Sequence, residues 1–262
     1  MLDRFNGKTV FVTGAARGLG LAIARRFHRE GANIVALDVR SELLAAAWDQ
    51  AACVLSVVVD VTEGQAVRAA VASAVERFGR IDVLANVAGI AMEQPFLDIP
   101  EADWRKIIEV NLTGVFLVAQ AVARQMAGQN PPGGVIINMA SKNGITAEVK
   151  YAPYNASKAG VILLTKTMAG DLAEHNIRVN AVAPGYCATP LTEEMDPEEF
   201  RRRYCDQLIP LGRLGKPEEV AGTFAFLASD DAGFINGATI LMDGGHLAID
   251  GRKMHAWDDI AL

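Results

Sequence analysis

The chain reads Thr13-Gly14-Ala15-Ala16-Arg17-Gly18-Leu19-Gly20 directly after an apolar run at 8–13, and a segment with apolar residues at intervals of four follows. A buried strand, a glycine-rich turn and a helix in this order are typical of a dinucleotide-binding loop, because the free N–H groups at a helix start bind phosphate. Gly14 permits a tight turn, Gly18 lets the backbone approach a pyrophosphate, and Gly20 allows close contact between helix and sheet. The spacing departs from Gly-x-Gly-x-x-Gly, so the interpretation depends on the rest of the chain.

Apolar runs and helical patterns alternate beyond this turn. The runs that predict strands lie at 8–13, 33–38, 54–60, 81–86, 135–140, 177–183 and 238–242. Helical patterns begin at Gly18 and cover 63–78, 101–126 and about 151–175. Nearly continuous apolar strands indicate a parallel sheet covered by helices on both faces. The sequence therefore predicts an α/β protein with a doubly wound, seven-stranded parallel sheet of the Rossmann type, as a single domain over 1–262.

Composition narrows the class of function. The formal net charge of −6 argues against a nucleic-acid surface built on positive charge, and no apolar run approaches the ~20 residues of a membrane span. The N-terminus lacks the apolar region of a signal peptide. The three cysteines lack Cys-x-x-Cys spacing and the four histidines are scattered, so no metal site is expected. We expect a cytoplasmic protein with a small-molecule partner.

Tyr154 and Lys158 lie four residues apart in a predicted helix. Residues i and i+4 share one helix face, so the Lys158 ammonium should approach the Tyr154 phenol. A phenol titrates near pH ~10, and a nearby cation lowers its pKa. The pair therefore predicts a tyrosine that gives or takes a proton at neutral pH. An isolated Tyr-x-x-x-Lys pair is more often two solvated helix residues. The glycine turn in the same α/β pattern favours a proton-transfer role for this pair.

The cofactor preference rests on two opposing side chains. Asp38 ends the second predicted strand, where its carboxylate can accept hydrogen bonds from the adenosine ribose and repel a 2′-phosphate. Arg17, in the glycine turn, could instead pair with a phosphate. We weigh Asp38 more heavily because it lies at the hydroxyl itself, and predict NAD as the cofactor, with NADP as the alternative. Asp60, after the third strand, could face the adenine or could cap the following helix.

The chain resembles the short-chain dehydrogenase/reductase family over essentially its whole length. The matching elements are Thr13 to Gly20, Asp60-Val61, Asn86-Val87-Ala88-Gly89, Asn111, Ser141, Tyr154 with Lys158, and Pro184-Gly185 followed by Thr189. The order and spacing of so many elements make the resemblance specific. One departure is visible, because the family's usual Asn-Asn-Ala-Gly has valine at position 87. We expect the turn to survive, since Asn86 and Gly89 remain.

The resemblance implies roles for the individual residues. Tyr154 would be the general acid/base, and Lys158 would lower its pKa and hold the nicotinamide ribose. Ser141 would hydrogen-bond the substrate oxygen, and Asn111 would bind a water that links Lys158 to solvent. The residues expected to bind the cofactor are Gly14, Arg17, Gly18, Leu19, Gly20, Asp38, Asp60, Val61, Asn86, Ala88, Gly89, Tyr154, Lys158, Pro184, Gly185 and Thr189.

The substrate should bind at loops that follow the carboxyl ends of the strands. Candidate contacts are Ser141, Asn143, Tyr154 and Tyr186, and 186–210 is expected to form a mobile lid. Polar side chains in these loops, Glu148 among them, favour a polyol, sugar or other polar hydroxy compound. The resemblance also implies a homotetramer in which the helices at 101–126 and 151–175 pack against their copies. We expect the apolar residues of the tail, 246–262, to dock at a subunit interface.

Three functions are compatible with these residues. The leading prediction is an NAD-dependent oxidoreductase that interconverts a secondary alcohol and its ketone. An NADPH-dependent reductase of 3-oxoacyl thioesters is the nearest alternative, because that activity is common in the family that the chain resembles. A non-catalytic dinucleotide sensor is the alternative from another class. The intact set of Asn111, Ser141, Tyr154 and Lys158 argues against the sensor, which has no need of a proton relay.

Overall fold

The computed structural model describes residues 3–48 and 52–249. Its sheet has seven strands, all parallel, in the order β3-β2-β1-β4-β5-β6-β7. The strands are β1 (Thr9–Thr13), β2 (Asn33–Asp38), β3 (Val54–Val58), β4 (Val83–Asn86), β5 (Gly134–Met139), β6 (Ile177–Pro184) and β7 (Thr239–Met242). The predicted fold class and number of strands are confirmed.

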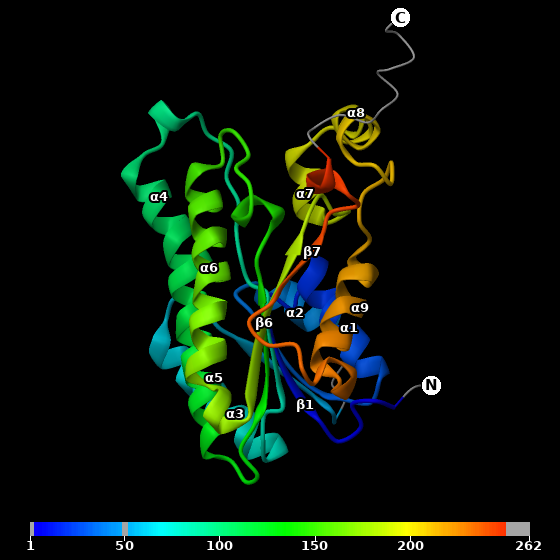
Figure 1. Ribbon diagram of the computed structural model, residues 1–262. Helices are drawn as coiled ribbons and strands as arrows, with labels where there is room; N and C mark the ends of the chain where they lie inside the picture. Colours follow the sequence, from blue (N-terminus) through cyan, green and yellow to red (C-terminus); the bar gives the residue numbers. More distant parts are fainter. Residues whose placement is uncertain (1–2, 49–51, 250–262) are drawn as a thin grey trace, which may run out of the picture.

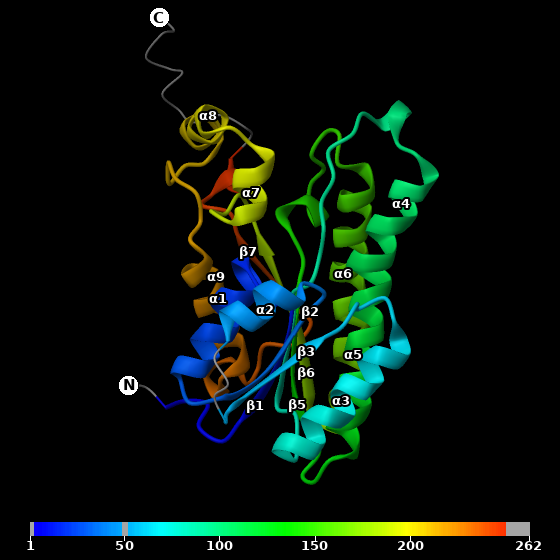
Figure 2. The same cartoon turned by 180° about the vertical axis from the view of Figure 1, so that it is seen from behind.

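Helices cover both faces of this sheet (Figures 1 and 2). One layer holds α1 (Gly18–Arg29), α2 (Ser41–Ala47) and α9 (Pro217–Ala228). The other holds α3 (Gly64–Phe78), α4 (Glu101–Ile108), α5 (Gly114–Gly128) and α6 (Ala152–Asp171). Two further helices, α7 (Pro190–Met195) and α8 (Glu198–Leu208), lie beyond the carboxyl ends of the strands (Figure 1).

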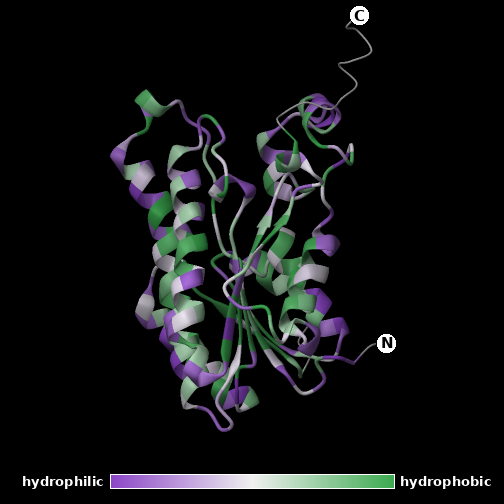
Figure 3. Ribbon diagram, in the orientation of Figure 1, coloured by the Kyte–Doolittle hydropathy of each residue, from purple (hydrophilic) through white to green (hydrophobic). Residues whose placement is uncertain are grey.

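The inner strands of the sheet are largely apolar because both of their faces are covered, whereas the edge strand β3 is partly exposed. Val10 and Val12 pack into the core beneath α1 and α9, whereas Phe11 between them packs into the core beneath α3 and α5. Successive side chains of a strand point to opposite faces, so a strand between two helix layers has no solvent-facing position. The hydrophobic residues accordingly lie along the sheet and on the inward sides of the helices (Figure 3).

The strand order reverses between β1 and β4, which places the turns after these two strands side by side. Gly14 follows β1 with a φ of 70°, a left-handed conformation that glycine adopts without strain. A Cβ built at Gly14 would lie 3.1 Å from the Cα of Ala88 in the turn after β4. This close backbone approach forms the crevice in which doubly wound proteins bind their ligands.

Gly20→Ala should disrupt this crevice. A Cβ at Gly20 would lie 2.0 Å from the carbonyl oxygen of Gly14, so the glycine turn would have to move. Overpacking of this kind costs about 1–3 kcal/mol, and we expect NADH to bind about tenfold to a hundredfold more weakly, as measured by its fluorescence. Gly128→Ala is the matched control, because a Cβ at Gly128 would have no atom within 4 Å. Equal NADH affinity in the two variants would contradict the expected role of Gly20.

The structure differs from the sequence-based expectation in its helices. The predicted helix at 101–126 is continuous but contains a π-helical turn at Glu109–Thr113 between α4 and α5. This helix has the length and hydropathy of a membrane span, yet its buried residues Val118, Val122 and Met126 belong to the core. The prediction missed α2, α7 and α9. The start of α9 carried a signal, since Pro217 occupies its first turn and the Glu219 carboxylate accepts a hydrogen bond from the Lys216 N–H at 2.7 Å.

The expected lid is two helices, α7 and α8, joined by a short link. The Thr189 hydroxyl caps α7 by accepting a hydrogen bond from the Thr192 N–H at 3.3 Å. Most of the predicted tail, from residue 250 to the C-terminus, lies outside the described residues, and His246–Ala248 forms a single 3-10 turn.

Candidate active site

Thr13 joins the two turns that form the crevice. Its hydroxyl oxygen accepts hydrogen bonds from the backbone N–H groups of Val87 and Ala88, at 2.9 and 3.0 Å. Asn86 donates from its side-chain amide to the Val115 carbonyl at 2.9 Å, which anchors the same turn to α5. The turn is held through the backbone of residue 87, so a valine side chain there is compatible with the geometry. The sequence analysis assigned Thr13 no role of its own.

Asp38 lies at the end of β2 and is 7% exposed. One carboxylate oxygen accepts a hydrogen bond from the N–H of Ala16 at 3.1 Å, and the other accepts one from the N–H of Arg40 at 3.0 Å. These bonds fix the carboxylate against the glycine turn. Each oxygen retains the capacity to accept a further hydrogen bond, which the predicted contact with a ribose hydroxyl requires.

Arg17 is engaged by the lid. Its guanidinium forms a two-pronged ion pair with the carboxylate of Glu194 on α7. This hydrogen bond, with charge from Arg17 and Arg40, lowers the pKa of Glu194. A Cβ built at Gly18 would lie 3.8 Å from Pro190, so the first turn of α7 adjoins the glycine turn. The pairing joins residues 177 positions apart, and nothing local in the sequence predicts it.

Two expected cofactor contacts have partners within the chain. The Asp60 carboxylate accepts hydrogen bonds from the N–H and hydroxyl of Thr62, at 2.9 and 2.8 Å, and so stabilises the turn before α3. This resembles the capping role weighed against adenine contact, although the N-cap of α3 itself is Glu63. The Thr189 hydroxyl, expected to hold a carboxamide, also lies 3.0 Å from the Thr192 hydroxyl.

Tyr154 and Lys158 lie on one face of α6, as predicted from their spacing. The Lys158 ammonium lies 5.7 Å from the centroid of the Tyr154 ring and donates a hydrogen bond to the Met139 carbonyl at 2.8 Å. Burial lowers the pKa of Lys158 to about 8. Lys158 is therefore a cation whose charge is lost at moderately alkaline pH.

The expected lowering of the Tyr154 pKa is not found. Burial raises the pKa of Tyr154, and a hydrogen bond with Ser141 opposes that rise. The desolvation of the phenolate outweighs the hydrogen bond. Lys158 is not among the groups that lower the pKa of Tyr154. Its ammonium lies over the Tyr154 ring and donates a hydrogen bond to the Met139 carbonyl. Ser141 is thus the side chain that favours the ionised tyrosine in the structure.

Asn111 is fully buried in the π-helical turn between α4 and α5. Its side-chain oxygen accepts a hydrogen bond from the Ile90 N–H at 2.8 Å, and its amide donates to the Ile90 carbonyl at 2.8 Å. The extra residue of a π-helical turn frees backbone groups and re-aims side chains, and such turns are frequent at functional sites. A Cβ built at Gly89 would lie 3.2 Å from the Asn111 oxygen and 3.5 Å from the Lys158 nitrogen, so these groups share one small space.

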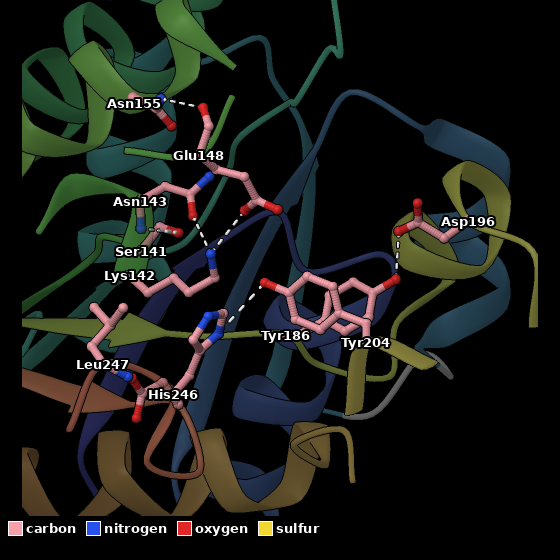
Figure 4. Close-up of polar contacts among 11 residues, drawn as sticks. Ser141, Lys142, Asn143, Glu148, Asn155, Tyr186, Asp196, Tyr204, His246 and Leu247 are labelled. Atoms are coloured by element: carbon pink, nitrogen blue, oxygen red, sulfur yellow. Dashed lines mark hydrogen bonds and ion pairs between the residues drawn. The ribbon is translucent and has the colours of Figure 1, made fainter. Parts of the chain in front are cut away.

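The substrate side of the crevice contains polar residues that the sequence analysis did not select (Figure 4). Asn143, a predicted contact, accepts a hydrogen bond from Lys142 at 2.9 Å. Tyr186, also predicted, donates to Asp196 at 2.5 Å. Lys142, Tyr204 and His246 gather with them, although they lie far apart in the sequence. In residues 3–48 and 52–249, no group of three or more His, Cys, Asp or Glu side chains is arranged to hold a metal ion.

The chain is similar to known proteins over nearly its whole length. A family model described as "Enoyl-(Acyl carrier protein) reductase" matches residues 14–246. The chain is 44% identical to a 3-oxoacyl-[acyl-carrier-protein] reductase of Thermotoga maritima, covering 92% of this chain and 98% of that protein. It is 39% identical to an NAD-dependent glycerol dehydrogenase of Listeria innocua, covering 91% and 93%. A crystal structure of a short-chain type dehydrogenase/reductase from Mycobacterium marinum superposes with a TM-score of 0.88 at 37% identity, covering 95% and 98%.

Proposed function

The chain belongs to the short-chain dehydrogenase/reductase family, and on that premise we propose that it is an NAD-dependent oxidoreductase that interconverts a polar secondary alcohol and its ketone. One observation carries the proposal. Tyr154 is hydrogen-bonded to Ser141 and has the Lys158 ammonium 5.7 Å from its ring centroid, at the carboxyl edge of the sheet. A proton-transferring side chain and a dinucleotide crevice thus occupy the same edge.

Nicotinamide dinucleotide fits the residues of the crevice. The glycine turn gives close backbone access beside Ala88, and Asp38 presents carboxylate oxygens where an adenosine ribose would lie. The bound cofactor would supply or accept the hydride. Tyr154 would give a proton to the substrate oxygen during reduction and take it back during oxidation. Ser141 would donate a hydrogen bond to the same oxygen, and Lys158 would hold ribose hydroxyls with its ammonium.

Two carboxylates support NAD over NADP. Asp38 would repel a 2′-phosphate. The nearby Arg17 guanidinium could attract a 2′-phosphate, but it is already paired with the Glu194 carboxylate. The 3-oxoacyl thioester reduction with NADPH remains the second candidate, because a reductase acting on such a substrate is 44% identical to this chain. The placement of Asp38 weighs against it.

We also propose that the enzyme is a homotetramer. The stripe Val161, Leu164, Thr165 and Met168 on α6 does not support this, since Val161 and Thr165 are fully buried against the sheet of their own subunit. Support comes from the outward side of the helix layer. Leu163 on α6 is 66% exposed and Phe116 on α5 is 42% exposed, and a second copy packed on these helices would cover both side chains.

A binding assay followed by a turnover assay tests the function. NADH fluorescence measures cofactor binding, and a panel of secondary alcohols with NAD and with NADP measures turnover. Oxidation of polar alcohols with NAD supports the proposal, whereas turnover confined to 3-oxoacyl thioesters with NADPH supports the second candidate. Binding of NADH with no turnover of any substrate would instead support a dinucleotide sensor.

The two directions of reaction should depend on pH in opposite ways. Oxidation needs the Tyr154 phenolate as a base, so kcat/KM should rise with pH, because burial raises the pKa of Tyr154. Reduction needs the protonated phenol and should fall as pH rises. Ser141→Ala should move the oxidative limb to higher pH, because the hydrogen bond from Ser141 lowers the pKa of Tyr154. Profiles with the same direction of change, or a limb unmoved by Ser141→Ala, would contradict these roles.

A further inference from the structure

Lys142, the residue after Ser141, is a buried cation on the substrate side of the crevice. It is 6% exposed, and its ammonium donates hydrogen bonds to the Asn143 side-chain oxygen at 2.9 Å and to the Glu148 carboxylate at 2.8 Å (Figure 4). A charge removed from water is tolerated only when it is paired and hydrogen-bonded. Lys142 and Glu148 therefore form one neutral unit, and the Glu148 side chain remains 33% exposed.

The Glu148 carboxylate is tied to the neighbours of both reacting residues. It pairs with Lys142, the residue after Ser141, at 2.8 Å. Burial contributes most to the raised pKa of Tyr154, and the charge of Glu148 raises it further. The loop that carries it is fixed to α6, because Asn155 donates from its side-chain amide to the Glu148 carbonyl at 2.8 Å. A carboxylate with an exposed edge beside Tyr154 is placed to contact substrate atoms near the reacting carbon.

Aromatic side chains from the lid and from the C-terminal segment close the same space. The Tyr204 ring on α8 packs edge-on against the His246 ring with centroids 5.5 Å apart, and its hydroxyl lies 3.5 Å from the His246 Nδ1. The Tyr186 ring packs against the Tyr204 ring with centroids 4.6 Å apart and the ring planes tilted by 45°. Burial, and secondarily the charge of Lys142, lower the pKa of His246, so the histidine adds no positive charge at neutral pH. The pocket combines one neutralised ion pair with aromatic walls.

We propose that Glu148, held in place by Lys142, selects a neutral polyhydroxylated substrate by accepting a hydrogen bond from a hydroxyl group close to the reacting carbon. This inference rests on the proposed function. A carboxylate on the substrate would be repelled by the Glu148 carboxylate. The Lys142 ammonium, which could attract such a substrate, is already paired with Glu148. A long acyl chain would cover the exposed edge of Glu148 without supplying a hydrogen-bond donor in place of water. A polyol satisfies the exposed edge of Glu148 and places its C–H groups against the aromatic rings.

Matched pairs of substrates test the proposal. Each pair consists of a linear polyol and the aldonic acid of the same chain length, which differ only in one terminal carboxylate. Wild type should have the higher kcat/KM for the polyol. Glu148→Gln leaves the Lys142 ammonium without a counter-charge, so the ratio of acid to polyol should rise by about tenfold or more, as expected for a hydrogen bond to a charged group. Glu148→Asp keeps the charge and should retain the preference for the polyol.

Glu93→Gln is the control for net charge. Glu93 pairs with Lys150 at 2.9 Å, but both side chains are exposed, so its loss should leave the ratio of acid to polyol unchanged within about twofold. NADH fluorescence confirms that each variant keeps its cofactor site.

The possible failures are distinguishable. If wild type oxidises no alcohol with NAD, the proposed function fails. If wild type oxidises polyols but prefers the acids, the proposed function stands and the selection by Glu148 is wrong. The same holds if Glu148→Gln leaves the ratio unchanged, or if Glu93→Gln shifts it equally. If the Glu148→Gln protein no longer binds NADH, the wild type and Glu148→Asp provide the test. A higher kcat/KM for the acids than for the polyols in these two proteins overturns the inference.

Discussion

Tyr154→Phe should reduce turnover by about a hundredfold or more while NADH still binds. The substitution removes the hydroxyl that we propose exchanges a proton with the substrate oxygen, and keeps the ring over which the Lys158 ammonium lies at 5.7 Å. Steady-state kinetics measure the loss of kcat, and fluorescence measures the affinity for NADH.

Tyr151→Phe provides the matched control for Tyr154→Phe. It removes a hydroxyl from a tyrosine whose ring centroid lies 6.3 Å from that of Tyr154, at the start of the same helix. We expect it to change kcat by only a few-fold. If Tyr154→Phe keeps turnover within a few-fold of wild type, another group moves the proton and the assignment is wrong.

Asp38→Ala should lower the preference for NAD over NADP by about tenfold to a hundredfold in kcat/KM. The change removes a ribose hydrogen bond and a repulsive carboxylate together, and a hydrogen bond to a charged group contributes about 1.5–3 kcal/mol. Arg17 stays bound to Glu194 in this variant, so it is not yet free to pair with a phosphate. Adding Glu194→Gln should release Arg17 and shift the preference further toward NADP.

The control for that second step is Asp38→Ala with Glu193→Gln, which removes the same charge from the neighbouring position of α7. It should behave like Asp38→Ala alone. A wild-type enzyme that already prefers NADP would show that Asp38 does not govern the choice. Equal shifts from the two double variants would show that the Arg17–Glu194 pair has no part in it.

Much of the fold followed from patterns that are local in the sequence. The apolar runs predicted all seven strands, because strands covered on both faces are nearly continuous in apolar residues. The four-residue spacing of Tyr154 and Lys158 placed them on one face of α6. The helices α7 and α9 were not predicted although proline lies in the first turn of each. The π-helical turn at Asn111 had no signal in the spacing of residues.

Local patterns in the chain were enough to predict the α/β architecture, the glycine turn and the shared helix face of Tyr154 and Lys158, since each pattern spans only a few positions. The contacts between distant segments appear only in the fold: Glu194 binds Arg17, Glu148 pairs with Lys142, and Tyr204 packs against His246. It also reversed the expected direction of the Tyr154 pKa, because burial depends on every element packed around the phenol. Charge–charge contacts and desolvation are set by the folded arrangement of distant segments, and no local pattern records them.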